Sequence, residues 1–267
     1  MKHRLLERAK QIIIDVLIVG FAAGILLAAG LLLWVSTLEI PDLSSFEERR
    51  VLQSTKIYDR TGEVLLYDLH QDVRRTVVPF EEISRHIKNA TVAIEDDQFY
   101  THHGIDLRAI MRAALANLRA GDLLGGQGGS TITQQVVKNA VLEREKTLTR
   151  KVKEAILSVK IERTLSKDEI LGIYLNESPY GGTIYGVEEA AQAFFGKPAA
   201  DVTLPEAAYL AALPQAPTYL SPYGSNREDL DRRAALVLDR MRLNDFISEE
   251  EYEEAKASEV SFQPQVV

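Results

Sequence analysis

The feature that most constrains this chain is a run of twenty residues without a charged side chain, from Val16 to Val35. A helix rises about 1.5 Å per residue, so this run would be roughly 30 Å long, the thickness of the hydrocarbon layer of a bilayer. Trp34, near its end, suits a membrane interface. The run predicts one transmembrane helix, which we place at residues 12–35.

The charges that flank this run predict its orientation. Four basic residues and one glutamate lie in the first ten positions, whereas the first charged residues after the run are Glu39, Asp42, Glu47 and Glu48. An excess of Lys and Arg marks the cytoplasmic side of a membrane helix. We therefore expect residues 1–11 inside the cell and the remainder on the outer face of the cytoplasmic membrane, with a single crossing.

Two other interpretations of the run are weaker. The apolar part of a cleavable signal peptide usually has only about 7–15 residues, and no clear small-x-small cleavage site follows Val35. A buried helix of a globular domain is the second alternative, and twenty uncharged residues at the start of the chain do not favour it. Asp15 stands at the cytoplasmic edge of the run and is interpreted as an interfacial residue.

Composition excludes several classes of protein. The chain has 31 Lys and Arg against 39 Asp and Glu, a net charge of −8, which argues against a nucleic-acid partner. The 46% of hydrophobic residues are ordinary for a folded protein. Because there is no Cys, disulfides, thiolate zinc sites and Cys nucleophiles are excluded together.

Beyond the anchor the pattern is mainly helical. Residues 36–54 are polar and are interpreted as a linker. Residues 56–67 predict a hairpin, because two β-rich runs flank the turn sequence Asp-Arg-Thr-Gly, and residues 73–78 suit another strand. From about residue 80 the apolar spacing is helical. We expect a mainly α domain over 55–255 with a small N-terminal β element, followed by a C-terminal linker at 256–267.

Helix starts are marked by capping patterns. A Ser or Thr three residues before Glu or Gln satisfies the free N–H groups of a first turn. This spacing occurs at Thr131 with Gln134, Ser166 with Glu169, Thr203 with Glu206, and Ser248 with Glu251. After the helix that begins near Thr203, two prolines break the chain, and residues 232–242 predict a late amphipathic helix.

One helical segment has two possible environments. Residues 107–118 place apolar side chains at helical spacing with arginines among them. Such a face suits either the domain core or a membrane surface beside the anchor. The residues alone slightly favour the core.

Three consecutive acidic residues, Glu95-Asp96-Asp97, are a candidate acid–base site. Three neighbouring carboxylates are costly to ionise together, so one of them is a candidate general base or acid. A solvated acidic helix end explains the same residues. His102 and His103 follow, and local hydrogen bonding explains them better than a metal.

A glycine-rich loop and a basic stretch follow the acidic residues. Residues 121–129 contain five glycines before a helix start, which suits either an anion cradle or a flexible loop, and the sequence of a nucleotide P-loop is absent. Residues 138–163 hold eight basic residues against four glutamates, which suits either a solvated helix or a diphosphate site. Arg150 and Glu154, four apart, could orient one another at such a site or form a simple ion pair.

Taken in order, these segments resemble the five motifs of the peptidoglycan glycosyltransferases of glycosyltransferase family 51, found in class A penicillin-binding proteins and monofunctional relatives. The resemblance covers about residues 55–255. Residues 95–104 resemble E-D-x-x-F-x-x-H-x-G, 128–135 resemble G-x-S-T-I-x-Q-Q, 150–154 resemble R-K-x-x-E, 167–176 resemble K-x-x-I-L-x-x-Y-L-N, and 232–238 resemble the fifth motif. Gly172 departs from the family, which often has Glu there.

The resemblance implies a lysozyme-like, mainly α fold and a reaction. The enzyme would polymerise lipid II into glycan strands. Glu95 would be the general base that takes the proton from the 4-hydroxyl of the acceptor GlcNAc. That oxygen would attack C1 of the donor MurNAc, inverting an α-linked diphosphate to a β-1,4 bond with release of undecaprenyl diphosphate. Expected partners are lipid II, the growing strand, membrane lipids at residues 107–118, and cell-wall synthesis proteins, with no nucleic acid.

The resemblance also implies the site residues. Glu154 would be the second essential carboxylate, either orienting the cationic groups or holding a divalent cation (Mg or Mn), and no other cofactor is expected. Lys138, Lys146, Arg150 and Lys151 would bind the diphosphates. The remaining residues assigned to substrate are Asp96, Phe99, His102, Gly128, Ser130, Thr131, Gln134, Gln135 and Asn176.

Two rival functions and the extent of the chain stay open. A lysozyme-type hydrolase would also place a glutamate in a sugar cleft, but it needs no cationic patch for a diphosphate. A non-catalytic scaffold is the other rival, and the intact acidic and basic positions give it no support. The S-x-x-K and K-T-G elements of a transpeptidase are absent from these residues. The strand-like segment at 55–78 and the ending at 262–267 resemble a bifunctional enzyme, so we expect either a part of one or a naturally short enzyme.

Overall fold

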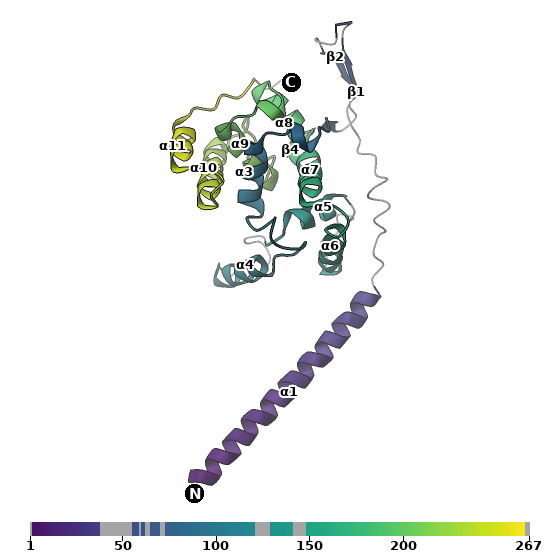
Figure 1. The fold of residues 1–267 in the computed structure, drawn as a ribbon, viewed down its shortest axis with the longest axis vertical. Coiled ribbons are helices and arrows are strands. Elements are labelled where there is room, and N and C mark those ends of the chain that lie inside the picture. The colour runs from purple at the N-terminus through teal and green to yellow at the C-terminus, as the bar shows by residue number, and fades with distance from the viewer. Residues whose placement is uncertain are drawn as a thin grey trace. The chain divides into compact units, whose positions relative to one another are not determined.

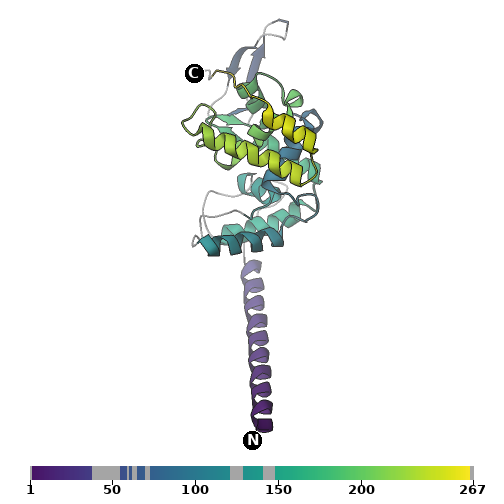
Figure 2. The ribbon, with the colours of Figure 1, turned by 90° about the vertical axis from the view of Figure 1, so that its left-hand side faces the viewer.

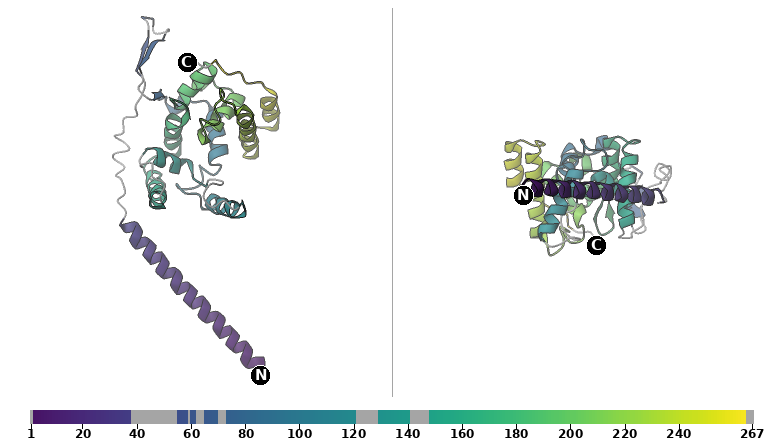
Figure 3. Two further views of the ribbon diagram at one scale, coloured as in Figure 1. Left: turned by 180° about the vertical axis from the view of Figure 1, so that it is seen from behind. Right: turned by 90° about the horizontal axis from the view of Figure 1, so that it is seen from below.

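The structure is a computed structural model that describes residues 2–37, 55–58, 60–61, 65–69, 73–120, 129–140 and 148–264. The chain divides into two units, which we take in turn. The first comprises residues 1–41 and 145–153, and the second comprises residues 42–144 and 154–267. Figure 1 labels the helices and strands, and Figures 2 and 3 show the same ribbon from other sides.

The first unit is dominated by one helix, α1 (Lys2–Ser36), drawn in purple in Figure 1. Its segment Lys10–Trp34 has 25 residues and a mean hydropathy of 2.7, which is long and apolar enough to cross a membrane. The predicted helix at 12–35 is thus confirmed as a helix compatible with membrane anchoring. Its orientation and the bounds of the flanking segments remain predictions.

The second unit is mainly helical, as the sequence predicts. Its helices run in chain order from α3 to α11. The helices are α3 (Arg85–Glu95), α4 (Leu107–Ala120), α5 (Ile132–Ala140), α6 (Leu148–Ile161, of which residues 154–161 belong here), α7 (Lys167–Glu177), α8 (Val187–Phe195), α9 (Leu204–Ala212), α10 (Arg227–Leu243) and α11 (Glu249–Ala257). Single turns of 3-10 helix lie at Phe80–Glu82, Ala199–Asp201 and Leu213–Gln215.

The strands form two small sheets. The predicted hairpin is confirmed, because β1 (Thr55–Tyr58) pairs antiparallel with β2 (Leu65–Leu69). The second sheet has the order β3-β5-β4, with β3 (Arg74–Arg75) parallel to β5 (Ile184–Tyr185) and β4 (Pro179–Gly181) antiparallel to it.

The strand that suits residues 73–78 is only two residues long. Beyond Arg75 the polar groups turn to other partners: Thr76 Oγ1 donates to Glu189, and Val78 N donates to the Asn176 side chain at 3.0 Å. Pro79, with no N–H, then follows. The N–H of Val78 thus bonds to a side chain instead of a neighbouring strand, and the strand is short for that reason.

The core of the second unit is built around α3, which packs against α9 and α10, while α5 packs against α7 (Figure 1). Ile87 on α3, Leu171 on α7 and Leu210 on α9 are fully buried. Burying each such side chain contributes about 1.5–3 kcal/mol. In Figure 2, α10 lies across this face of the domain with α11 beside it, in agreement with their packing.

The capping patterns are confirmed at all four predicted starts. Reciprocal capping boxes open α7, α9 and α11 at Ser166, Thr203 and Ser248. At α5, Thr131 N donates to Gln134 Oε1 at 3.0 Å and Gln134 N donates to Thr131 Oγ1 at 3.1 Å. These bonds satisfy N–H groups that the helix itself leaves free.

The late helix is longer than predicted. α10 begins at Arg227 rather than at residue 232. Its first turns are mostly charged, so the apolar periodicity that predicts a helix is missing there, although Leu230 is fully buried.

Candidate active site

Six elements of the second unit enclose a polar cleft of about 850 Å³. They are the end of α3, helices α4 and α5, α6 at Glu154, the 3-10 turn Leu213–Gln215, and one face of α10. The charged and polar lining residues are Glu95, Asp96, Asp97, Asp106, Arg112, Ser130, Thr131, Gln134, Gln135, Lys138, Glu154, Arg233 and Arg240. Eight of the residues that the sequence assigns to the site meet here.

Glu95 is the last residue of α3, and its position follows from how that helix is held. Ser84 caps the N-terminus by accepting a hydrogen bond from His86 N, and the chain leaves the helix at Asp96. Because α3 is clamped between α9 and α10, the carboxylate at its C-terminal end is presented to the cleft at a fixed place. The side chain of Glu95 is 13% exposed.

The two oxygens of the Glu95 carboxylate have different partners. Gln135 Nε2 on α5 donates to Oε2 at 2.8 Å, whereas Arg233 Nη2 on α10 lies 3.5 Å from Oε1. Two buried tyrosines, Tyr174 and Tyr180, lie close enough for their electrostatics to couple to Glu95. Burial raises the pKa of both phenols, and the charge of Glu95 raises it further.

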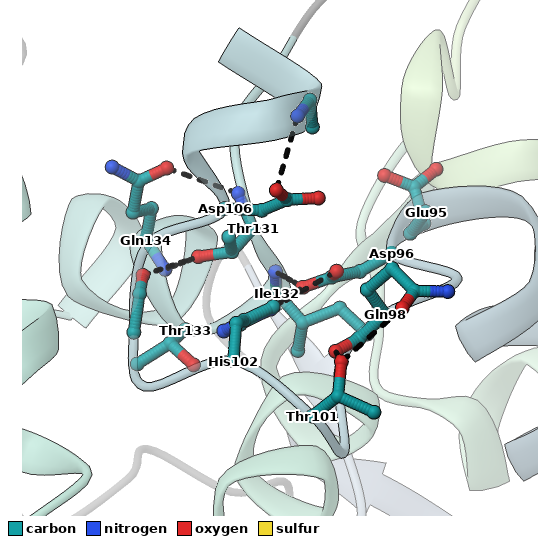
Figure 4. Close-up of polar contacts among 12 residues, drawn as sticks. Glu95, Asp96, Gln98, Thr101, His102, Asp106, Thr131, Ile132, Thr133 and Gln134 are labelled. Carbon is teal, nitrogen blue, oxygen red and sulfur yellow. Dashed lines mark hydrogen bonds and ion pairs between the residues drawn. The ribbon is translucent and has the colours of Figure 1, made fainter.

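Asp96 faces the opposite way, as Figure 4 shows. Its buried carboxylate accepts a bond from Ile132 N at 2.9 Å and one from His102 Nε2 at 2.9 Å. A carboxylate can only accept, so Nε2 carries the hydrogen. Ile132 is the first residue of α5, and an acidic cap there is also favoured by the helix dipole. Asp96 thus joins the end of α3 to the start of α5.

The contacts of Asp96 continue into a buried network. His102 Nδ1 lies 3.9 Å from Glu162 Oε1, and that oxygen accepts a bond from Thr133 Oγ1 at 2.5 Å. Lys167 Nζ donates to Glu162 at 2.8 Å and lies 4.5 Å from the centre of the Phe99 ring. We call Asp96, His102, Thr133, Glu162 and Lys167 the support network. It ties the ends of α3 and α6 to the starts of α5 and α7.

Three residues assigned to substrate lie outside the cleft lining. Phe99 is fully buried, and His102 belongs to the support network. Asn176 accepts from Val78 N and donates to Val78 O and Gly172 O, each at 2.9–3.0 Å. The structure gives all three a supporting place, whereas their contact with substrate stays a prediction.

The loop that joins α3 to α4 closes against α6 at a glycine. Gly104 has φ +85°, and a Cβ there would lie 2.7 Å from the backbone of Ser158. Gly104 O also accepts a bond from Thr131 Oγ1 at 2.8 Å. Only a glycine combines this backbone conformation with so close an approach. The approach positions the loop that carries His102.

Cationic side chains surround the cleft. Lys138 on α5, Arg112 on α4 and Arg240 on α10 form no ion pair within the part of the chain that the structure describes. Glu154 lines the cleft and is 1% exposed. Arg150 and Lys151 lie in the first turn of α6, which belongs to the other unit. Gly128 and Lys146 lie outside the described residues.

The divalent-cation alternative for Glu154 finds no ligand set. In the described ranges no three His, Asp or Glu side chains group as a metal site. The described residues do not by themselves make a metal site, so we derive no step through a metal, and a divalent cation at Glu154 stays a prediction.

No role was predicted from the sequence for Arg233 or Arg240. A signal for Arg233 exists, because it stands three residues after Leu230 and four before Val237, both buried. A charged residue in phase with a buried stripe must reach a polar partner, and for Arg233 that partner is Glu95.

The core interpretation of residues 107–118 is wrong. On α4 the large apolar side chains point outward: Leu107 is 70% exposed, Met111 65% and Leu118 65%. Arg108 and Arg112 are exposed on the same helix. An apolar face of this size with basic residues at its margin is typical of a membrane-surface helix.

Comparison with known proteins gives the relatives of this chain. A family profile described as Transglycosylase matches residues 62–242. The chain is 45% identical to penicillin-binding protein 1A of Aquifex aeolicus over 243 residues, which cover 90% of this chain and 33% of that protein. It is 42% identical to penicillin-binding protein 1A/1B of Bacillus subtilis and 38% identical to penicillin-binding protein 1A of Escherichia coli, covering 81% and 84% of this chain.

The chain spans a third or less of the length of these relatives: 33%, 24% and 26%. A crystal structure of penicillin-binding protein 1A from Haemophilus influenzae aligns with 80% of this chain and 22% of that one, at 23% identity and a TM-score of 0.46.

Proposed function

Because this chain belongs to the transglycosylase family, we propose that it is a peptidoglycan glycosyltransferase that polymerises lipid II into glycan strands. The observation that carries the proposal is Glu95. It stands at the end of α3 and lines the cleft together with cationic side chains. Its Oε1 has only a long contact, 3.5 Å, with Arg233 Nη2.

In the proposed reaction Glu95 is the general base. Its Oε1 takes the proton of the 4-hydroxyl of the acceptor GlcNAc, and the hydroxyl oxygen forms a bond to C1 of the donor MurNAc. The bond from C1 to the diphosphate oxygen breaks at the same time, and its electron pair leaves with undecaprenyl diphosphate. Attack opposite the leaving group inverts the α-linkage to β-1,4. A positioned base of this kind contributes about 10²–10⁴-fold.

The leaving diphosphate gains negative charge as the bond breaks, and cations stabilise it. Lys138 lines the cleft and is available for this role. Arg150, Lys151 and Lys146 are the further candidates that the family motifs supply. Glu154, buried in the cleft wall, would orient these cationic groups rather than touch the sugar.

The substrate is lipid-linked, so the site must work beside a bilayer. We propose that α1 crosses the cytoplasmic membrane with its N-terminus inside, and that the exposed apolar face of α4 contacts the outer leaflet. Helix α4 also contributes Arg112 to the cleft. Lipid contact and the reaction site therefore share one helix.

The rival function is hydrolysis of finished glycan. A hydrolase needs an acid and a base at the sugar, but it has no use for cations that bind a diphosphate. Three cations at this cleft form no ion pair with any residue that the structure describes, and they therefore favour transfer over hydrolysis: Lys138, Arg112 and Arg240.

The test is an assay of lipid II polymerisation in detergent with product analysis. The parent chain, Glu95→Gln and the control Glu254→Gln, which changes an exposed residue of α11, are compared. We expect β-1,4-linked strands and undecaprenyl diphosphate from the parent and the control, and none from Glu95→Gln. A folded parent that releases sugar from mature glycan but leaves lipid II unchanged would establish the hydrolase instead. A folded parent that binds lipid II without any turnover would leave the scaffold function.

A further inference from the structure

One buried charge in the cleft has no part in the reaction as described. Arg233 on α10 is 17% exposed on its side chain and lies against Glu95. Burial lowers the pKa of this guanidinium, and the neighbouring charge of Glu95 opposes that effect. A cation kept in such a place is costly unless it is paired, and Glu95 is its partner.

We propose that Arg233 is a positioning residue for the proposed general base: it holds the Glu95 carboxylate in place at the cleft and leaves Oε1 accessible to the acceptor hydroxyl. The inference rests on the role of Glu95 under the proposed function. Arg233 itself is not assigned contact with the reacting atoms.

The guanidinium of Arg233 is anchored by a second hydrogen bond. Arg233 Nε donates to Ala212 O at 2.9 Å, at the C-terminal end of α9, where helix carbonyls lack partners within the helix. Nε and Nη2 belong to one rigid plane, so this bond fixes where Nη2 can be. The 3.5 Å between Nη2 and Glu95 Oε1 therefore cannot shorten into a tight fork without breaking the anchor.

The two oxygens of the Glu95 carboxylate differ in how closely they are hydrogen-bonded. Gln135 binds Oε2 at 2.8 Å, a full hydrogen bond, whereas the contact of Oε1 with Arg233 lies at the outer limit of one. Oε1 thus keeps lone pairs for an incoming hydroxyl. The arginine supplies charge at a distance where Coulomb attraction is still strong. It orients the base without occupying it.

Glu95 lies among buried phenols and charged side chains. Tyr174 on α7 and Tyr180 on β4 are buried and couple electrostatically to it. The other charged groups that line the cleft are Asp96 and Asp97 beside α3, Asp106 and Arg112 at α4, Lys138 on α5, Glu154 on α6, and Arg240 on α10. Of the described residues, Arg233 alone has an ion-pair distance to Glu95.

The neighbouring residue provides a matched control. Arg232 lies on the same helix, but its side chain is 77% exposed and pairs with Asp229 three residues earlier. Successive helix residues point about 100° apart, so one arginine of the pair faces the cleft and the other faces water. Exposed pairs such as Arg232–Asp229 contribute about 0–1 kcal/mol. A comparison of the two arginines therefore separates position from charge number.

The experiment measures kcat and KM for lipid II at neutral pH in the parent, Arg233→Gln, Arg233→Lys and Arg232→Gln. We expect Arg233→Gln to lower kcat at neutral pH about tenfold, with a smaller change in KM, because a fraction of the base effect is lost. Arg233→Lys, which keeps the charge near Glu95, should recover part of the lost kcat, and Arg232→Gln should match the parent in both kcat and KM.

The proposal is overturned if Arg233→Gln behaves like the parent, or if Arg233→Lys loses as much kcat as Arg233→Gln. Failure of the proposed function looks different, because then the folded parent makes no strands. In that event the surroundings of the Glu95 carboxyl still test Arg233. Its ¹³C signal at neutral pH, identified by its absence in Glu95→Gln, should change position in Arg233→Gln and stay where it is in Arg232→Gln. An unchanged signal in Arg233→Gln would contradict the inference.

Discussion

Glu95 and Asp96 are neighbours in the chain, but their carboxylates differ in how completely they are hydrogen-bonded. Asp96 has its carboxylate buried and bonded to Ile132 N and His102, inside the support network. Glu95 has one oxygen bonded to Gln135 and the other lightly held at the cleft. A fully satisfied carboxylate contributes order, whereas a partly satisfied one contributes reactivity. The support network around Asp96 therefore fixes the position of the Glu95 carboxylate at the cleft.

The largest expected effect breaks the support network at Asp96. Asp96→Ala leaves His102 Nε2–H and Ile132 N–H buried without an acceptor. Each buried donor left without an acceptor costs about 1–3 kcal/mol, so the two together cost about 2–6 kcal/mol. We expect the free energy of unfolding, measured in denaturant, to fall by that amount. Asp97→Ala, one residue further, should change it by less than about 0.5 kcal/mol, and equal losses in the two variants would refute the special place of Asp96.

A smaller effect is expected at the far end of the same network. Glu162→Gln keeps an acceptor for Thr133 Oγ1 but removes the charge that Lys167 binds at 2.8 Å. We expect a loss of about 1–3 kcal/mol in the free energy of unfolding.

The matched control for Glu162 is Glu249→Gln, which breaks an exposed pair with Arg242. It should cost no more than about 0.5 kcal/mol. Thermal denaturation of both variants is the measurement, and a Glu162→Gln variant as stable as Glu249→Gln would show that the buried network contributes nothing.

On the cleft side the expected effect moves from stability to turnover. Lys138→Gln removes a cation that lines the cleft and forms no ion pair with the described part of the chain, so folding should be unchanged. We expect kcat/KM for lipid II to fall about 10–100-fold, or about 1.4–2.7 kcal/mol of transition-state stabilisation. Lys160→Gln, which removes one charge from an exposed site on α6, is the control. A similar loss of activity in both variants would mean that net charge alone is responsible.

The smallest expected effect lies on α4. Leu115 is 54% exposed, so Leu115→Gln should leave the free energy of unfolding within about 0.5 kcal/mol of the parent. If the face touches lipid, turnover should fall a few-fold in bilayer vesicles and stay unchanged in detergent. Equal activity in both media would remove α4 from the lipid interface.

Local sequence signals predicted much of the fold. Capping boxes located four helix starts because each is a bond between residues three apart, and α1 followed from its uncharged length. The pairing of β3 with β5 was not foreseen, since it joins Arg74 to Ile184 through two residues on each side. No local pattern encodes such a contact. For the helix at 107–118 the residues alone slightly favoured the core, and only the family resemblance indicated lipid, because amphipathic spacing does not say what covers the apolar face.

The candidate site was predicted in part. Glu95, Gln135 and Lys138 meet at the cleft as the motifs imply. The sequence could not say which of three adjacent carboxylates is left open, because that depends on His102 and Ile132, which reach Asp96 from other elements. Arg233 was missed for a similar reason, since its role is set by a carbonyl on α9 and a carboxylate on α3.

The most direct test of this account measures turnover and stability together in Glu95→Gln and Asp96→Asn. We predict that Glu95→Gln still folds and binds lipid II, loses some stability because Arg233 is left without its charged partner, and makes no glycan strands. Asp96→Asn should lose stability by about 1–3 kcal/mol because its amide cannot accept both bonds as well, while retaining measurable polymerisation at a temperature where it is folded. Strand synthesis by Glu95→Gln at the rate of the parent would contradict the central claim that the open carboxylate of this pair is the base.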